Sequence, residues 1–137
     1  MANHLNRELP GSLPSDRPCL AIELGAGLGA VGLSLARYCG MEVVLTDVPE
    51  CLPLLSENVL QNFPDGGGPK VSALRWGDAD QLAALRQQHG RFDFVVGSDV
   101  TAAVTECLDP LLVSASQLLR PGGCMFFCSQ DRPGEAK

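Results

Sequence analysis

The residues best suited to chemistry in this sequence are glycines and carboxylates that follow or end runs of apolar residues. Glu23 lies inside the apolar run 19–24, and the glycine turn 25–29 follows it directly. Asp47 and Asp99 stand just after two further apolar runs. Glycine lets the backbone approach a ligand closely, and a carboxylate in an apolar run is costly unless a partner uses it. These positions therefore predict a ligand site.

The elements that must hold these residues alternate between strands and helices. Apolar periodicity and turn residues predict strands at 19–24, 42–46, 70–75, 92–97 and 124–128, and helices at 2–9, 28–38, 50–62, 79–89 and 106–119. Gly40 is expected to end the helix 28–38, and 121–123 to form a turn. This alternation predicts an α/β fold with a mostly parallel sheet and helices on both faces. In such sheets ligands bind beyond the carboxyl ends of the strands, where the glycine turn lies.

Composition limits the classes of function. The chain has 137 residues, of which 45% are hydrophobic and 19% charged, which predicts one globular domain at 19–137 after a lead-in segment at 1–18. Its net charge of −6 argues against a nucleic-acid partner and an acidic membrane surface. There is no apolar stretch of 18 residues, and the first ten residues are polar. We expect a cytoplasmic protein, also present in the nucleus.

The cysteines do not suggest a metal centre. Six cysteines and two histidines are spread along the chain, and the cysteines fall in expected strands and helices, as reduced core thiols do. Cys124 and Cys128 would be about 13 Å apart in a strand, too far to share one zinc ion. We therefore predict no metal site.

A dinucleotide-binding interpretation stays open at this point. The segment 27–32 reads Gly-Leu-Gly-Ala-Val-Gly, and Asp47 follows Gly27 by 20 residues, as a nicotinamide or flavin fingerprint requires. No Tyr-x-x-x-Lys pair for hydride chemistry is evident, which counts against an oxidoreductase.

Five motifs stand in order between about Cys19 and Ser129. They are Glu-Leu-Gly-Ala-Gly-Leu-Gly-Ala-Val-Gly-Leu at 23–33, Val-Val-Leu-Thr-Asp at 43–47, Asn-Val-Leu-Gln-Asn at 58–62, Leu-Arg-Trp-Gly at 74–77 and Phe-Asp-Phe-Val-Val-Gly-Ser-Asp at 92–99. In this order they resemble the motifs of the seven-stranded S-adenosylmethionine-dependent methyltransferases. Among these enzymes the chain is most similar to the protein-lysine N-methyltransferases that act on chaperones, AAA ATPases and translation factors, nearest the valosin-containing-protein branch.

The resemblance implies a Rossmann-like methyltransferase fold and an S-adenosylmethionine site. Its cofactor-binding residues would be Glu23, Gly25, Ala26, Gly27, Asp47, Trp76 and Ser98. Asp47 would accept the hydrogens of both ribose hydroxyls, and Trp76 would lie against adenine. Ser98 would line the pocket near the methyl group, and the turn 25–27 would pass beneath the methionine part. Asp78 is a lesser candidate for the adenine amine.

Several of these residues also have structural interpretations. Trp76 could be a core residue, and Asp47 could cap a helix. Glu23 could be held by backbone N–H groups. Asn58 and Asn62 are expected to pack or to bond within turns rather than to bind a ligand.

The resemblance implies a lysine side chain of a protein as substrate. Asp99 is the candidate catalytic residue, because a carboxylate near the amine helps to orient it and take its proton. The family commonly has a tyrosine three residues after this acid, whereas this chain has Ala102. A non-catalytic cofactor-binding or interaction module is therefore the alternative. A small-molecule or nucleic-acid methyltransferase also stays open.

The end of the sequence leads to an expectation about the sheet. Eight residues follow Ser129, fewer than one more helix and two strands need, so we expect a fold that lacks the last two strands of the family. The strand 124–128 would then be an exposed apolar edge that predicts association. Phe126 and Phe127 are expected in the core.

Overall fold

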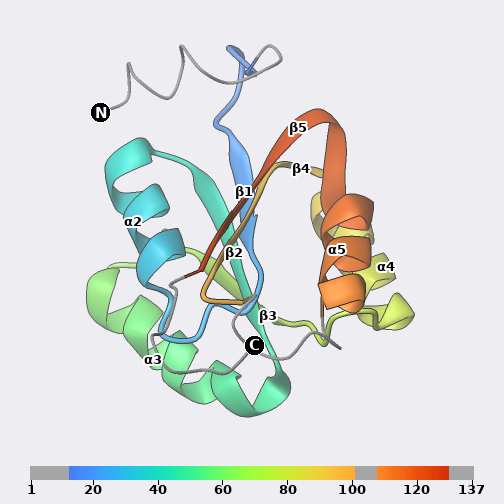
Figure 1. Cartoon of the computed structure of the whole chain (residues 1–137). Helices are drawn as coiled ribbons and strands as arrows, with labels where there is room; N and C mark the ends of the chain where they lie inside the picture. The colour runs from blue at the N-terminus through green and yellow to red at the C-terminus, as the bar shows by residue number, and fades with distance from the viewer. Residues whose placement is uncertain (1–12, 101–107, 130–137) are drawn as a thin grey trace.

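In the computed structural model, residues 13–100 and 108–129 are described (Figure 1). The predicted helix 2–9 and the first part of the predicted helix 106–119 lie outside these residues. The elements are β1 (Leu20–Glu23), α2 (Ala30–Cys39), β2 (Glu42–Asp47), the 3₁₀ helix η1 (Pro49–Cys51), α3 (Leu52–Asn62), β3 (Lys70–Ala73), α4 (Ala79–His89), β4 (Phe92–Ser98), α5 (Leu108–Leu118) and β5 (Leu119–Cys128).

The strands form one parallel sheet in the order β3-β2-β1-β4-β5. The chain builds outward from β1 through β2 and β3, and then returns to the other side of β1 with β4 and β5. This reversal places a topological switch point at the carboxyl ends of β1 and β4, and ligands bind at such points in open α/β sheets. The predicted fold class is therefore present.

Two hydrophobic clusters cover the two faces of the sheet. Side chains of α4 and α5, such as Leu82 and Leu111, pack on one face, and Leu55 of α3 with partly buried side chains of α2 packs on the other. Figure 1 shows α2 and α3 on one side of the sheet and α4 and α5 on the other. The strands β1, β2 and β4 are buried almost throughout, as the continuous apolar runs in the sequence predict.

The helix ends explain why the predicted boundaries are close to the observed ones. Gly40 follows α2 in a left-handed conformation, and its N–H donates to Leu35 O, so the predicted stop is confirmed. At the start of α4, Asp78 accepts hydrogen bonds from the N–H groups of Asp80 and Gln81.

The predicted turn 121–123 is wrong as a boundary, because β5 begins at Leu119. Phe92 pairs with Leu119 and Phe94 with Cys124, so the residues between Leu119 and Cys124 bulge out opposite Asp93. Pairing therefore continues on both sides of a bulge rather than starting after a turn.

Asp93 is the buried centre of an ion-pair cluster at the amino end of the sheet. Its fully buried carboxylate accepts bonds from both terminal nitrogens of Arg17, at 2.7 and 3.0 Å, from Leu20 N at 2.8 Å, and from Arg120 Nε. Burial alone would raise the pKa of Asp93, but the bonds from Arg17, Leu20 and Arg120 outweigh it and lower the pKa to about 2. This cluster ties the end of the predicted lead-in to β4 and β5.

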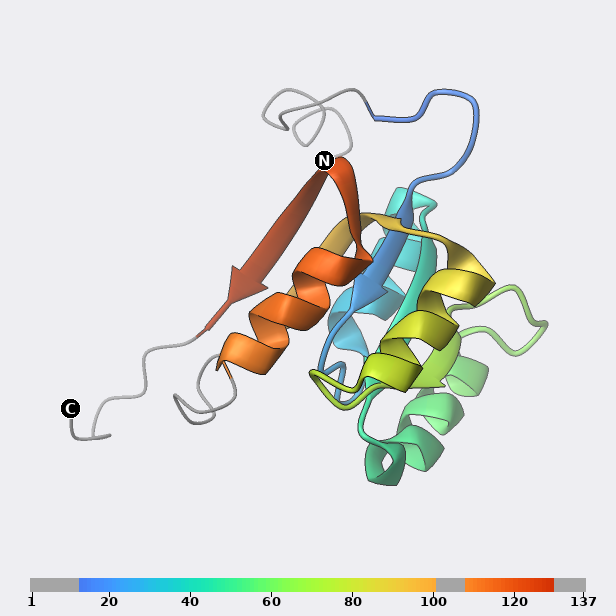
Figure 2. The same cartoon turned by 90° about the vertical axis from the view of Figure 1, so that its right-hand side faces the viewer.

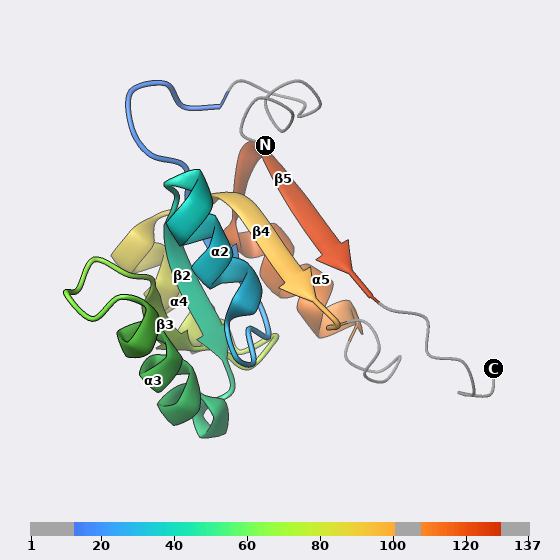
Figure 3. The same ribbon diagram turned by 90° about the vertical axis from the view of Figure 1, so that its left-hand side faces the viewer.

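Among the described residues, β5 lies at the edge of the sheet with β4 as its neighbour (Figures 2 and 3). Phe127 packs against the core on the α5 side, as expected, but Phe126 is 45% exposed and the expectation that it is a core residue is wrong. Its side chain stacks on Phe94, with ring centroids 6.2 Å apart. In Figure 3 no described helix lies in front of β5 on this face.

Candidate functional site

The structure brings the predicted cofactor-binding residues to one edge of the sheet. Gly25, Asp47, Trp76 and Ser98 stand at or just after the carboxyl ends of β1, β2, β3 and β4, respectively. Because all of these strands are parallel, their carboxyl ends share one edge. The residues with the predicted roles therefore stand around the point where the strand order reverses.

The glycine turn has a backbone shape that favours glycine. Gly25 and Gly27 have φ values of +64° and +56°, and a Cβ at Gly25 would lie 2.8 Å from Val100 Cγ1 and 3.1 Å from Trp76 Cζ2. Gly27 is exposed, and apart from its chain neighbours no atom of residues 13–100 and 108–129 lies within 4 Å of the corresponding position there. The buried Ala26 anchors the turn, since its N–H donates to Thr46 O. The turn thus has open space above Gly27.

Asp47 is half-buried and faces the glycine turn. Its carboxylate oxygens accept hydrogen bonds from Gly27 N, at 2.8 Å, and from Val48 N, at 2.7 Å. The helix-cap interpretation is wrong, because the cap position before η1 is occupied by Val48 and no side-chain hydrogen bond caps this helix. Each carboxylate oxygen can accept a further bond, so Asp47 can still receive two hydroxyl donors.

Glu23 is buried beneath the turn, with 2% of its surface exposed. Its Oε2 atom accepts a hydrogen bond from Gly32 N at 2.8 Å. Burial raises its pKa to about 7, the bond from Gly32 opposes this rise, and the charge of Asp47 adds to it. Glu23 therefore has the backbone partner that the structural interpretation expects, and its contact with a cofactor stays a prediction.

Trp76 is half-buried at the carboxyl edge. Its ring packs on the hydrophobic cluster of α4 and α5 and also faces Gly25. Trp76 therefore contacts the core, as the structural interpretation expects, and also stands beside the glycine turn, where the predicted contact with adenine would be made. Asp78 has a role that the sequence reasoning missed, because it caps α4. The signal was present in the sequence, since an aspartate directly precedes the helical pattern that begins at Ala79.

Asp99 is exposed beyond the end of β4 and has a positive φ of 57°, as no other described non-glycine residue does. Its N–H donates to Cys128 O at 2.7 Å, which fixes the backbone at the end of β4 to the end of β5. Aspartate tolerates this conformation better than most residues, and such positions cluster at functional sites. The segment with Ala102 lies outside the described residues.

Asn58 and Asn62 bond within the protein, as expected. Asn58 Nδ2 donates to Leu28 O at 3.0 Å, and Asn62 Nδ2 donates to Asn58 O at 2.8 Å. The first of these bonds ties α3 to the glycine turn. Asn58 therefore supports the shape of the turn from outside.

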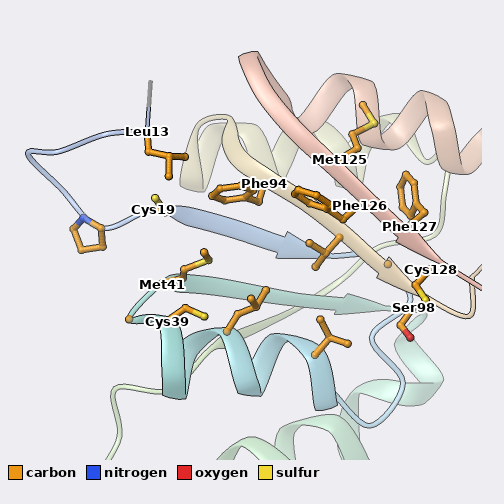
Figure 4. Close-up of a pocket in the computed structure, with 16 residues that line it drawn as sticks. Leu13, Cys19, Cys39, Met41, Phe94, Ser98, Met125, Phe126, Phe127 and Cys128 are labelled. Carbon is orange, nitrogen blue, oxygen red and sulfur yellow. The ribbon is translucent and has the colours of Figure 1, made fainter. Parts of the chain in front are cut away.

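An apolar groove of about 820 Å³ opens on the α2 side of β4 and β5. Its walls include Leu35, Met41, Phe94, Val96, Met125 and Phe126. Figure 4 shows Ser98 and Cys128 at the end of this groove, where the strands finish. Among the predicted cofactor-binding residues only Ser98 lines it, so the groove adjoins the candidate site and is not the site itself.

Residues 13–100 and 108–129 contain no cluster of three or more potential metal ligands. The five cysteines in these ranges form no disulfide bond with one another. The expectation of core thiols is wrong for Cys39 and Cys128, which are exposed, whereas the half-buried Cys19 and Cys124 pack against the core. Cys51 is half-buried. No helix in the described ranges has both the length and the apolar character needed to cross a membrane.

A family model described as lysine methyltransferase matches residues 3–137. The chain belongs to the lysine methyltransferase family. Within that family, it is 38% identical over 112 residues to EEF1A lysine methyltransferase 3 of Mus musculus, a match that covers 81% of this chain and 45% of that protein. It is 41% identical over 86 residues to protein N-lysine methyltransferase METTL21A of Mus musculus, covering 61% of this chain and 37% of that protein.

The chain therefore spans less than half the length of these two curated relatives. The resemblance to the lysine methyltransferase family is confirmed, and the nearness of the valosin-containing-protein branch stays a prediction.

Solved structures confirm the fold of this lysine methyltransferase family member. PKMT2 from Rickettsia typhi, in complex with AdoHcy, matches with a TM-score of 0.66 and 22% identity over 85% of this chain and 22% of that chain. Magnesium protoporphyrin IX methyltransferase (ChlM) from Synechocystis PCC 6803, with bound SAH, matches with a TM-score of 0.61 and 19% identity over 85% of this chain and 46% of that chain. These likenesses establish the Rossmann-like methyltransferase fold.

Proposed function

We propose that this chain binds S-adenosylmethionine and that the protein to which it belongs transfers the methyl group to a lysine side chain of a protein. The observation that carries the proposal is the half-buried Asp47 beside the open, exposed Gly27 at the carboxyl edge of the sheet. Membership of the lysine methyltransferase family supports it. The names of the two mouse relatives, both lysine methyltransferases, support the same substrate class.

In this proposal each cofactor-binding residue contacts a different part of the ligand. The oxygens of Asp47 accept the hydrogens of the ribose hydroxyls, and the ring of Trp76 offers an apolar face to adenine. The turn 25–27 passes beneath the methionine part, and Ser98 lines the region near the methyl group. The cofactor supplies the methyl group as a sulfonium. The residues present fit this ligand, because Gly27 leaves room and Asp47 keeps free acceptor sites.

Asp99 is the proposed catalytic residue. A lysine amine must be deprotonated to react, and an exposed carboxylate at the carboxyl edge can orient the amine and take its proton. The protein supplies the alignment of the two reactants and the exclusion of water.

The substrate is proposed to be a protein such as a chaperone, an AAA ATPase or a translation factor. The name of EEF1A lysine methyltransferase 3 favours the last of these classes. A cytoplasmic location, with a nuclear pool, is proposed with it. Nucleic acid and membrane are not proposed as partners, since the net charge is −6.

The carboxylate of Glu23 weighs against the nicotinamide alternative. A dinucleotide places its pyrophosphate at the N–H groups that begin the helix after the glycine turn. Here Gly32 N, one of the first N–H groups of α2, already donates to Glu23 and does not offer that hydrogen to a pyrophosphate. S-adenosylmethionine has no phosphate to place there.

The test is calorimetric titration of the purified chain with S-adenosylhomocysteine and, separately, with NAD. We expect micromolar binding of S-adenosylhomocysteine and no heat from NAD. Binding of NAD, or of neither ligand by a folded chain, would contradict the proposal. Cofactor binding without methylation of any protein of the proposed classes would favour the non-catalytic module.

We further propose that the chain associates through the open edge of β5. A charged residue and a proline usually protect an edge strand, and β5 has both at its start, in Arg120 and Pro121. The segment 123–129 that follows them carries neither. The exposed fractions of Met125 and Phe126 are 37% and 45%. An edge strand with exposed apolar side chains favours pairing with a strand of a second copy.

Replacing Met125 with lysine should therefore reduce self-association. A charge on the edge strand must be desolvated when a second strand pairs with it. Sedimentation velocity over a concentration series should show a larger monomer fraction for Met125→Lys than for the wild type. The control is Leu60→Lys on α3, where the wild-type leucine is 66% exposed and distant in sequence from β5. If both variants behave like the wild type, β5 is not the associating edge.

A further inference from the structure

The amino end of α2 is capped by a residue from another element. Gly29 occupies the cap position with a φ of 84° and has no side chain that could accept a hydrogen bond. A cap side chain normally bonds to the N–H of the second or third residue of a helix. Glu23 makes that bond from β1, because its Oε2 accepts from Gly32 N, the third residue of α2.

The space around Gly32 is too small for a side chain. A Cβ at this position would lie 2.1 Å from Leu45 Cδ2 and 2.8 Å from Glu23 Oε2. Gly32 is also the buried residue of α2. Glycine at this position therefore lets the helix backbone come within hydrogen-bond distance of a carboxylate on the sheet.

Glu23 and Asp47 lie on the same face of the sheet. Glu23 pairs with Leu45 in the parallel register between β1 and β2, and Asp47 stands two residues further along β2. Alternate residues of a strand point to the same face. The two carboxylates hold the two ends of one segment, because Asp47 bonds to Gly27 N and Glu23 bonds to Gly32 N.

We propose that Glu23 is a positioning residue of the cofactor site, which holds the amino end of α2 and releases a proton to solvent when ligand hydroxyl groups occupy Asp47. This inference rests on the proposed function. Asp47 contacts the ligand, and Glu23 acts through Asp47 and through Gly32.

The coupling follows from the electrostatics of the pair. Burial is the main cause that raises the pKa of Glu23 to about 7, and the bond from Gly32 N lowers it. The third cause is the negative charge of Asp47 on β2, which raises the pKa of Glu23. From α2, Glu23 is contacted by the backbone of Gly32, which carries no charge. Hydroxyl donors on Asp47 spread its charge and weaken the repulsion. Glu23 then ionises more readily, and its bond to Gly32 N strengthens.

The experiment is calorimetric titration with S-adenosylhomocysteine at pH 7 in two buffers of different ionisation enthalpy. A released proton makes the observed enthalpy depend on the buffer. We expect a larger buffer dependence for the wild type than for Glu23→Gln, which keeps a carbonyl acceptor for Gly32 N but cannot ionise. Between pH 6 and 8 the wild-type affinity should rise about threefold more than that of the variant, the effect of half a pKa unit.

Two further variants complete the test. Glu50→Gln removes an exposed carboxylate that pairs with Arg75, and it should keep the wild-type buffer dependence.

Asp47→Asn, measured without cofactor, removes the repulsion on Glu23. Because the raised pKa makes the neutral form of Glu23 the stabilising one, the wild type should lose stability as pH rises toward and through 7. In Asp47→Asn this loss should occur at lower pH.

The outcomes separate the two proposals. Equal buffer dependence in the wild type and Glu23→Gln, with binding intact, overturns the inference and leaves the proposed function. An unchanged pH profile of unfolding in Asp47→Asn overturns it as well. Absence of S-adenosylhomocysteine binding by the folded wild type overturns both.

Discussion

Replacing Asp47 with alanine should weaken the binding of S-adenosylhomocysteine about a hundredfold or more. Two charge-assisted hydrogen bonds to the ribose would be lost, and each contributes about 1.5 kcal/mol or more. Together they amount to about 3 kcal/mol, or roughly two factors of ten in affinity. The glycine turn would also lose its bond from Gly27 N to Asp47, which adds to the loss.

Calorimetric titration measures this effect, and two variants serve as references. Asp47→Asn keeps one acceptor oxygen and should bind with intermediate affinity. Glu50→Ala removes a nearby exposed carboxylate and should bind like the wild type. Circular dichroism must show that Asp47→Ala is folded. If folded Asp47→Ala binds as tightly as the wild type, Asp47 is not the ribose acceptor.

Asp93→Ala should strongly destabilise the fold. It would remove the buried acceptor of Arg17, Leu20 N and Arg120 at once. Removing one partner of a buried ion pair typically costs about 3–5 kcal/mol, and the lower end applies because Arg17 is 47% exposed. Urea unfolding at pH 7 should show this loss, whereas Asp65→Ala in the exposed loop after α3 should change stability little.

The same carboxylate predicts the acid sensitivity of the fold. The pKa of Asp93 is lowered to about 2 in the folded state, below its ordinary value of 3.8. Its stabilising contribution is therefore present above about pH 4 and is lost as pH falls through about 2. Thermal unfolding from pH 7 to pH 2 should show this loss in the wild type and much less of it in Asp93→Ala. Parallel pH profiles for the two proteins would contradict the assignment.

Local patterns in the sequence were enough to predict the order and type of the described elements. The apolar runs of β1, β2 and β4 and the glycine after α2 act within a few residues, so their consequences are readable without the fold. The positions of Asp47, Trp76 and Ser98 at one edge also followed, because parallel strands place their carboxyl ends together.

Interactions over long sequence separations could not be predicted in the same way. Asp93 meets Arg17 and Arg120, which lie 76 and 27 residues away, and nothing near Asp93 in the sequence indicates either partner. The early start of β5 has the same origin, because Arg120 contacts Asp93 from within the bulge. The bond from Gly32 N to Glu23 depends on how closely α2 approaches β1.

The central position of β1 also affects how the chain folds. Its register with β2 joins residues about 20 positions apart, but its register with β4 joins residues about 70 positions apart. At a synthesis rate of about 5–20 residues per second, the side of β1 that pairs with β4 stays unpaired for several seconds during translation, until β4 has been synthesised. Pairing of β1 with β4 also requires closing the long stretch of chain between them, and the entropy lost in this closure slows the step. We therefore expect slow refolding, and a nascent chain that benefits from a chaperone until β4 has inserted beside β1.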